Sequence, residues 1–144
     1  MALNKLLDNL SCSLGQFYTL SPVLSCSKDL KVKEVIRLMN ENHVGSVVIV
    51  EHKKPIRIFT ERDVLKKVVG SQAVDIHTTP IEYLMTRDPV TITLETSFTH
   101  IMGAMRLGKF RHLIIVNQNG YLEGIISIKD VLSRVIDLVN DLKE

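Results

Sequence analysis

The chain of 144 residues is poor in the residue types that many specialised sites require. It has no tryptophan, seven glycines, two cysteines and five scattered histidines. Cys12 and Cys26 form no CxxC pair, and the histidines complete no set of metal ligands. This pattern predicts two free thiols in a reducing compartment. The glycines form no phosphate-binding run, which excludes a Walker loop.

Long apolar runs and a strong net charge are also lacking. No apolar stretch approaches the roughly 18 residues of a membrane span. Residues 1–10 (MALNKLLDNL) lack the apolar core and cleavage site of a secretory signal. Eighteen basic and sixteen acidic residues give a net charge of +2, a balance that argues against a nucleic-acid binder or a membrane-surface protein. We therefore expect a cytoplasmic protein without membrane contact.

The sequence also lacks a recognisable catalytic pattern. No nucleophile stands at a motif spacing from a base, and we expect neither a metal nor a cofactor. These absences favour a protein that is not an enzyme.

What the chain does have is an internal repeat. Residues 56–69 (IRIFTERDVLKKVV) align with residues 123–136 (EGIISIKDVLSRVI) at a shift of 67. Upstream, residues 32–50 align with residues 98–116 at a shift of 66. The shift changes by one in turn-like segments, where an extra residue is tolerated. The chain therefore contains two copies of one structural unit.

Each copy has the pattern of a β-α-β-β-α unit. In the first copy, VKEVIRLMNEN has apolar residues at helical spacing, whereas SVVIV is short and β-branched and predicts a buried strand. The order of elements is an opening strand in 22–26, a helix, strands at 46–50 and 56–59, and a helix after Thr60. The second copy opens with a strand in 89–93. It ends in a longer helix whose apolar stripe comprises Val131, Leu132, Val135, Leu138, Val139 and Leu142.

The domain organisation follows from the repeat. We expect an N-terminal segment at 1–16, repeat 1 at 17–70, a linker at 71–83 and repeat 2 at 84–144. A unit of this size buries too little surface to be stable alone, so the two repeats are expected to pack with pseudo-twofold symmetry. Leucines at positions 3, 6, 7 and 10 fit a helical stripe. This helix would either dock on a partner or pack on its own module.

The ordered motifs MTRDPVTI and RHLIIVNQNGYLEGIISIKDVL, in tandem units, closely resemble the CBS-domain pair. This module is named for cystathionine β-synthase and also occurs in inosine monophosphate dehydrogenases and in the γ subunit of AMP-activated kinase. The resemblance covers residues from about 17 to 140. It implies an α/β (α+β) fold and a regulatory module. It further implies that AMP, ADP, ATP or S-adenosylmethionine binds in two clefts between the repeats.

The resemblance also implies particular site residues. The aspartate of the family's G-h-x-[S/T]-x-x-D element binds the ribose hydroxyls, and its serine or threonine binds the phosphates. The first copy has Arg57 where the second has Gly124, and Ile114 stands where the family often has proline. The cleft built on Ser127 would comprise Thr19, Ser21, Pro22, Val23, Arg111, His112, Leu113, Ser127, Lys129 and Asp130. The cleft built on Thr60 would comprise Ser46, Val47, Thr60, Arg62, Asp63, Thr86, Pro89 and Val90.

Elementary physics supports this assignment and also supplies an alternative. A helix N-terminus has unsatisfied N–H groups that favour phosphate, and Arg62 and Lys129 could add charged hydrogen bonds. However, Ser/Thr-x-x-Asp is also an ordinary helix start, in which the hydroxyl caps the helix. Duplication would copy a cap as readily as a binding site. Both interpretations therefore stay open, and His112 can be either a surface residue or a ligand contact.

Two functional hypotheses follow from these two interpretations of the motif. In the first, the chain senses an adenine nucleotide and reports it to an unknown protein target, with the Ser127 cleft as the better site. In the second, it is a ligand-free scaffold. In both, a homodimer would bury the apolar faces of the helices after Thr60 and Ser127, since isologous dimers are the commonest oligomers. A nucleic-acid ligand is a third possibility that the near-neutral charge disfavours.

Overall fold

The computed structural model describes residues 2–71, 74–84, 89–108 and 110–143. The chain forms two compact units, each assembled from separate stretches of sequence. The Thr60 unit contains Pro22–Pro89 and Gly120–Leu122. The Ser127 unit contains Met1–Ser21, Val90–Asn119 and Glu123–Glu144. Each unit is described separately below.

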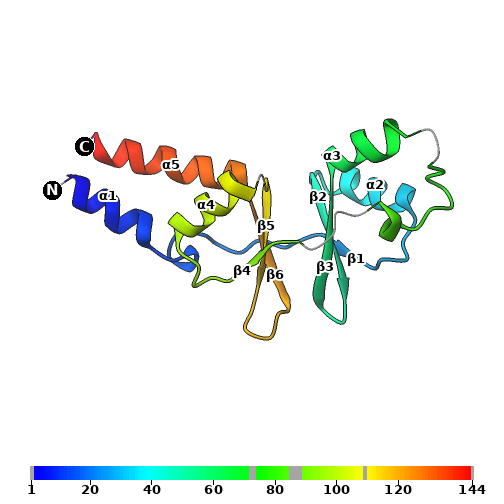
Figure 1. The fold of residues 1–144 in the computed structure, drawn as a ribbon, viewed down its shortest axis with the longest axis horizontal. Coiled ribbons are helices and arrows are strands. Elements are labelled where there is room, and N and C mark those ends of the chain that lie inside the picture. The colour runs from blue at the N-terminus through cyan, green and yellow to red at the C-terminus, as the bar shows by residue number, and fades with distance from the viewer. Residues whose placement is uncertain (1, 72–73, 85–88, 109, 144) are drawn as a thin grey trace. The chain divides into compact units, whose positions relative to one another are not determined.

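The Thr60 unit has a three-stranded sheet in the order β1-β2-β3, with its helices on one face (Figure 1). Strand β1 is parallel to β2, and β2 is antiparallel to β3. The elements are β1 (Ser25–Cys26), α2 (Val32–Glu41), β2 (Ser46–Glu51), β3 (Lys54–Thr60), α3 (Glu61–Asp63), a π-helical segment (Val64–Val69) and a 3₁₀ helix (Ile81–Tyr83). The predicted β-α-β-β-α order is confirmed. The last helix differs from expectation in being mostly π-helical.

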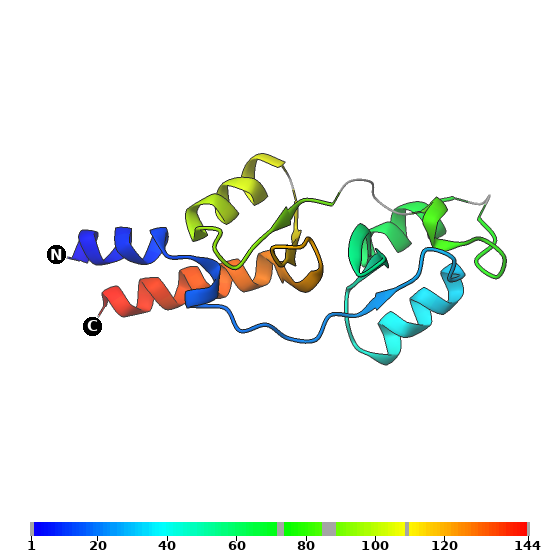
Figure 2. The same cartoon turned by 90° about the horizontal axis from the view of Figure 1, so that it is seen from below.

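The Ser127 unit repeats this plan with the strand order β4-β5-β6. Its elements are α1 (Ala2–Ser11), a 3₁₀ helix (Leu14–Gln16), β4 (Thr91–Ile92), α4 (Phe98–Gly108), β5 (His112–Val116), β6 (Leu122–Ser127) and α5 (Ile128–Leu142). Helices α1 and α5 lie side by side (Figure 2). Leu6 and Leu10 of α1 pack against the core of this unit. The interpretation of residues 1–10 as a helix that packs on its own module is thus confirmed.

Each unit has its own hydrophobic core between sheet and helices. Phe98, Ile101 and Leu113 are fully buried in the Ser127 unit, and Phe59 and Val35 are fully buried in the Thr60 unit. The predicted buried strand is confirmed, because the side chains at 47, 48 and 49 are all fully buried. The predicted single stripe of α5 is only partly right. Its members divide between the core (Val131, Val135, Leu138) and the exposed face (Leu132, Val139, Leu142).

The stretch before repeat 1 packs into the Ser127 unit, and the stretch before repeat 2 packs into the Thr60 unit. Residues 12–15 pair with 94–98, through Leu14 N–H to the Thr96 carbonyl (2.8 Å) and Phe98 N–H to the Cys12 carbonyl (2.9 Å). At the corresponding positions of the Thr60 unit, Ile81 N–H donates to the Leu30 carbonyl at 2.8 Å. Leu14 and Ile81 are both fully buried. Leu14 and Ile81, which are related by the same shift of 67, therefore occupy corresponding places in the two cores.

Helix α2 ends in a Schellman motif with a non-glycine residue at its centre. The Val44 N–H donates to the Met39 carbonyl (3.1 Å), and the His43 N–H donates to the Asn40 carbonyl (3.3 Å). This arrangement requires a left-handed backbone at the residue after the cap, a position where glycine is usual. His43 has φ = 53°. The chain thus accepts backbone strain at the end of α2.

We predict that His43→Gly stabilises the protein by about 0.5–1 kcal/mol, because glycine adopts positive φ without steric cost. Thermal and urea unfolding monitored by circular dichroism would measure the change. Asn40→Gly is the matched control, since it places glycine inside the same helix and should lower the stability by a similar amount. Equal destabilisation by both substitutions would contradict the strain at His43.

Candidate functional site

Ser127 and Asp130 form a reciprocal cap at the start of α5. The Ser127 N–H donates to Asp130 Oδ2 at 2.7 Å, and the Ser127 hydroxyl donates to the same oxygen at 3.0 Å. The Asp130 N–H approaches Ser127 Oγ at 3.4 Å. This is a capping box, and it satisfies amide groups that a helix start leaves unpaired. The cap interpretation of the motif is confirmed at this position.

Thr60 and Asp63 make the same arrangement at the start of α3. The Thr60 N–H and hydroxyl donate to Asp63 Oδ2 at 2.9 and 3.1 Å. The Asp63 N–H lies 3.4 Å from Thr60 Oγ1. The duplicated motif is therefore a duplicated cap, and the two copies differ in what surrounds them.

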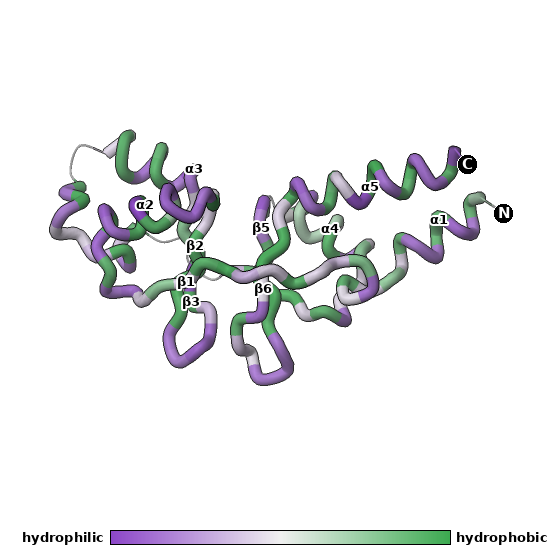
Figure 3. The backbone as a smooth tube through the Cα atoms, turned by 180° about the vertical axis from the view of Figure 1, so that it is seen from behind, coloured by the Kyte–Doolittle hydropathy of each residue, from purple (hydrophilic) through white to green (hydrophobic). Residues whose placement is uncertain are grey.

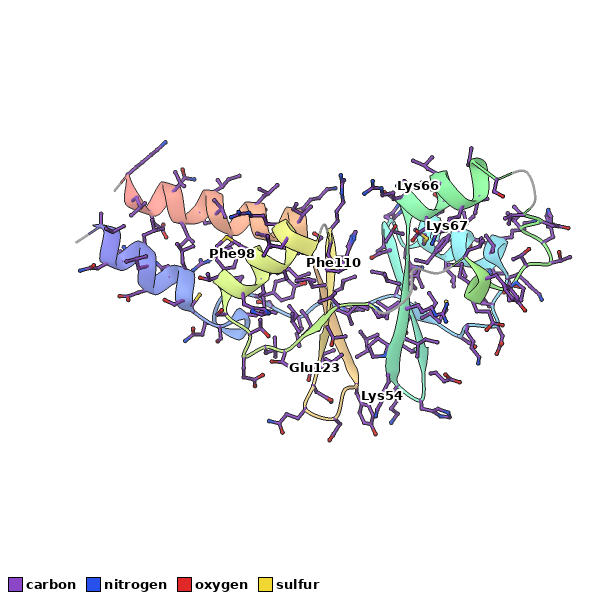
Figure 4. The ribbon with its side chains drawn as sticks, in the orientation of Figure 1. Lys54, Lys66, Lys67, Phe98, Phe110 and Glu123 are labelled. Carbon is purple, nitrogen blue, oxygen red and sulfur yellow. The ribbon has the colours of Figure 1, made fainter. Side chains whose placement is uncertain are left out.

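In the Thr60 unit, a lysine one helical turn later neutralises the aspartate. Lys67 Nζ lies 3.3 Å from Asp63 Oδ1 and donates to the Leu84 carbonyl at 2.9 Å; Lys67 is labelled in Figure 4. Asp63 is only 8% exposed. Both carboxylate oxygens of Asp63 thus have partners within the protein.

In the Ser127 unit, the corresponding cation points elsewhere. Arg134 stands where the first copy has Lys67, and its guanidinium lies 5.1 Å from the centre of the Phe17 ring. Among the described residues, no lysine, arginine or histidine lies within the 4.0 Å of an ion pair with Asp130. Asp130 is therefore the less neutralised of the two motif carboxylates.

A second difference lies at the loop that contacts each helix start. The Glu61 N–H donates to the Gly45 carbonyl at 3.0 Å, and the Ile128 N–H donates to the Arg111 carbonyl at 2.9 Å. A Cβ atom on Gly45 would meet the Glu61 carboxylate group at 3.2–3.4 Å. The Thr60 unit therefore has an acidic side chain beside this loop, whereas the Ser127 unit has Ile128 and a basic residue. Position 61 was not recognised from the sequence, although its alignment with Ile128 could have revealed it.

The segment from Tyr18 to Ser21 lies across β6 close to Asp130. The Tyr18 hydroxyl donates to the Ile125 carbonyl at 2.6 Å and also interacts with Ser21. Burial raises the pKa of the Tyr18 phenol, and the negative charge of Asp130 raises the pKa further. Thr19 and Ser21, two predicted site residues, are thus on the segment that Tyr18 anchors. Tyr18 itself was not predicted.

Gly124 is required by close packing of this segment. A Cβ atom at position 124 would lie 2.7 Å from Leu20 Cδ2 and 3.3 Å from Ile115 Cδ1. The absent side chain of Gly124 therefore makes room for Leu20. In the Thr60 unit the equivalent residue, Arg57, is half-buried on β3 opposite Ile49.

The remaining predicted residues occupy varied positions. In the Ser127 unit, Arg111 and Lys129 are exposed and His112 is half-buried at the start of β5. Leu113 and Val47 are fully buried in their respective cores, so only their backbone is available to a ligand. Ser46 pairs with Thr60 across β2 and β3, and Arg62 is exposed. Pro22, Val23 and Pro89 belong to the Thr60 unit, Val90 belongs to the Ser127 unit, and Thr86 lies outside the described residues.

Other kinds of site find little support in the described part of the chain. It contains no cluster of three histidine, cysteine, aspartate or glutamate residues that could hold a metal ion. No helix in the same part is long and apolar enough to cross a membrane. Cys12 and Cys26 are free thiols, as predicted, and burial raises the pKa of Cys26 to about 11.

Comparison with known proteins supports the repeat and the fold. Residues 15–70 and residues 81–137 each match the model of the CBS-domain family. A 17.7 kDa protein of Acidianus ambivalens is 32% identical over 111 residues, which are 76% of this chain and 65% of that protein. The chain spans less than two thirds of the length of these curated relatives.

Two solved structures share the fold over most of the chain. A CBS domain protein from Pyrobaculum aerophilum, complexed with AMP, is 25% identical with a TM-score of 0.75 and covers 89% of this chain and 98% of its own. A CBS domain pair in complex with 5′-methylthioadenosine and S-adenosyl-L-methionine is 20% identical with a TM-score of 0.74 and covers 88% of this chain and 97% of its own.

We predict that Tyr18→Phe changes the stability in a pH-dependent way. Because the folded-state pKa of Tyr18 is raised above 10.0, its stabilising contribution is complete below about pH 10 and is lost as the pH rises through the folded-state pKa. Tyr18→Phe should therefore be less stable than the wild type at neutral pH, and the difference should shrink above pH 10.

Urea unfolding at several pH values from 7 to 11.5 would measure this difference. Cys26 also titrates in this range but contributes equally to both proteins. Tyr83→Phe, at a side chain that is 73% exposed, is the matched control and should leave the pH profile unchanged. A Tyr18→Phe difference that is constant with pH would contradict the placement of the phenol beside Asp130.

Proposed function

The chain belongs to the CBS-domain family, and on this premise we propose that it is a regulatory module that binds an adenosine-containing ligand. AMP, ADP, ATP and S-adenosylmethionine are the candidates. Ligand binding would shift an existing conformational or association equilibrium, which an unknown protein target reads. We propose no catalytic role. The two free thiols suit a reducing compartment such as the cytoplasm.

The observation that carries the proposal is that the carboxylate of Asp130 has no cation beside it among the described residues. Its Oδ2 atom is used by Ser127, but no cation among the described residues neutralises its charge. A carboxylate in this state can accept hydrogen bonds from the two vicinal hydroxyls of a ribose, as carboxylates do in nucleotide-binding folds. The solved relatives described above, with AMP and with S-adenosylmethionine, support a ligand of this class.

The phosphate of a nucleotide would lie at the start of α5. Ser127, at the N-cap, and Lys129, in the first turn, are available there, and the helix dipole favours an anion. Arg111, on the adjoining loop, adds a second positive charge. His112 and the backbone of Leu113 would contact the base, with Thr19, Ser21, Pro22 and Val23 completing the site.

The corresponding site of the Thr60 unit would be weaker for a nucleotide. It would comprise Ser46, Val47, Thr60, Arg62, Asp63, Thr86, Pro89 and Val90. Lys67 already neutralises Asp63 at 3.3 Å, so a ribose would have to compete with this ion pair. Glu61 beside Gly45 repels a phosphate at the same helix start.

A ligand-free scaffold is the second candidate, and one observation favours it. Both Ser/Thr-x-x-Asp motifs form complete capping boxes from their own residues, so a capping role alone accounts for them. In this alternative, the chain forms a homodimer or binds its target equally well with and without nucleotide. In the regulatory proposal, the same homodimer forms through helices of both repeats, and its association depends on the ligand.

We predict that Asp130→Asn weakens nucleotide binding tenfold or more, since hydrogen bonds to a charged group contribute about 1.5–3 kcal/mol. Asparagine keeps the side-chain oxygen that accepts from the Ser127 N–H, so the helix cap is retained. Titration calorimetry with AMP, ADP, ATP and S-adenosylmethionine would measure the effect.

Asp63→Asn is the matched variant in the other repeat, and we expect it to change the affinity of the stronger site less than twofold. Circular dichroism would verify that both variants are folded. Absence of sub-millimolar binding by all four ligands to the wild type would favour the scaffold. Binding that is insensitive to Asp130→Asn would remove the ribose role of this residue.

A further inference from the structure

A polar pocket lies in the Ser127 unit, among residues that neither proposed nucleotide site uses. Its volume is about 390 Å³, which is in the range of small-molecule sites. Helices α1 and α5 lie side by side here, and both alternate between hydrophilic and hydrophobic residues (Figure 3). The lining comes from the end of α1, the turn after it and α5, and each lining side chain carries a hydrogen-bonding group: Asp8, Asn9, Ser11, Cys12, Gln16 and Arg134. The pocket therefore suits a polar ligand.

Arg134 brings an unpaired cation to this pocket. Its Nε atom is buried without a hydrogen-bond partner, and its guanidinium makes no ion pair with the described residues. The guanidinium lies 5.1 Å from the centre of the Phe17 ring, and this ring packs edge-on against Phe98. Stacking thus holds the group in place but supplies no acceptor for its N–H donors. Because the guanidinium is already ordered, an anion that binds it costs little further conformational entropy.

Two further groups in the pocket complement Arg134. Gln16 Oε1 accepts from the Ser13 N–H at 2.9 Å, so the amide NH₂ group of Gln16 remains as a donor. The carboxylate of Asp8 makes no hydrogen bond or ion pair with the described residues. Asp8 and Arg134 therefore line one pocket with opposite charges, yet they lie further apart than the 4.0 Å of an ion pair. A ligand with an anionic and a cationic group can pair with both, whereas Asp8 would repel a simple anion.

The corresponding positions of the Thr60 unit carry different chemistry. At the shift of 67, Lys67 stands in place of Arg134, and it already forms the ion pair described above. The exposed Tyr83 stands in place of Gln16. The architecture of the repeat therefore does not itself require an unpaired cation or an amide donor at these positions.

From the unpaired guanidinium, the Gln16 amide and the separate Asp8 carboxylate, we propose that the polar pocket binds a free α-amino acid. The ligand's carboxylate accepts hydrogen bonds from the terminal nitrogens of Arg134 and from the Gln16 amide, and its ammonium group donates to Asp8. Asn9 and Ser11, which also line the pocket, favour an uncharged polar side chain on the ligand. The chain would thus respond to a second class of metabolite, and this proposal does not depend on nucleotide binding.

Chemical-shift titration of the full chain by NMR, without nucleotide, would test the proposal. L-serine, L-asparagine and L-glutamine are the probes, and the Gln16 amide and the Arg134 Nε–H are the reporters. We expect dissociation constants of about 1 mM or below. Acetate and methylammonium should bind about tenfold more weakly or worse, because each engages only one of the two charges. No saturable binding of the three amino acids at about 20 mM, or acetate binding as tightly as they do, would overturn the proposal.

Charge-removing variants give an independent readout. Arg134→Gln and Asp8→Asn should each weaken amino-acid binding about tenfold or more, since each removes a hydrogen bond between charged groups. Lys5→Gln on α1 and Asp137→Asn on α5 are the matched controls, because they remove the same kinds of charge from exposed positions on the same two helices. Both controls should leave the affinity unchanged, and circular dichroism would verify that all four variants are folded.

Unchanged affinity in Arg134→Gln or Asp8→Asn, or an equal loss in the controls, would contradict the assignment of the polar pocket. A chain that binds nucleotide but none of the amino acids would overturn this inference and leave the proposed function in place. The two proposals therefore fail separately.

Discussion

The short backbone pairing between residues 12–15 and 94–98 is the constraint on which the Ser127 unit depends. It inserts Leu14 into the core, where this side chain is fully buried, and it brings Phe17 into edge contact with Phe98. From there the chain continues over β6, where Tyr18 is hydrogen bonded and Leu20 covers Gly124. The start of the chain thereby becomes one wall of the candidate site. The Thr60 unit uses the stretch around Ile81 in the same way. Both units thus take a core residue from the stretch that precedes the other repeat.

The two copies of the Ser/Thr-x-x-Asp motif show that nearly the same local geometry can have different electrostatic surroundings. Both helix starts are capped with nearly the same distances. One turn later, a lysine in the first copy reaches back to its aspartate, whereas the arginine in the second copy stacks on an aromatic ring, and its Nε is buried with no hydrogen-bond partner among the described residues. Ring stacking thus removes from Asp130 the cation that Asp63 retains. The asymmetry between the two candidate sites comes from residues outside the motif, which is the reason that the motif alone could not resolve it.

Much of the fold was predictable because it depends on local patterns. The strand around Val48, the helix that begins after Ser127 and the β-α-β-β-α order follow from periodicity, β-branched runs and capping residues. Two features were not predictable in this way. The helix after Thr60 was expected to be an α-helix, but most of it is π-helical. The apolar residues of α5 were expected to form one stripe, yet Leu132 and Val139 face outward, because the periodicity of a helix does not say which of its apolar residues the sheet will cover.

The amino-acid sequence by itself determined the duplication, the element order, the free thiols and the positions where the helices after Thr60 and Ser127 begin, since each depends on residues a few positions apart or on composition. Tertiary structure alone decided which leading segment enters which core, where Lys67 and Arg134 point, and that Tyr18 lies near Asp130. These features join residues that are many positions apart, as Tyr18 and Ile125 are, and their energies depend on burial and neighbouring charge. These energies arise only when the chain is folded. They give two similar helix starts different electrostatic surroundings.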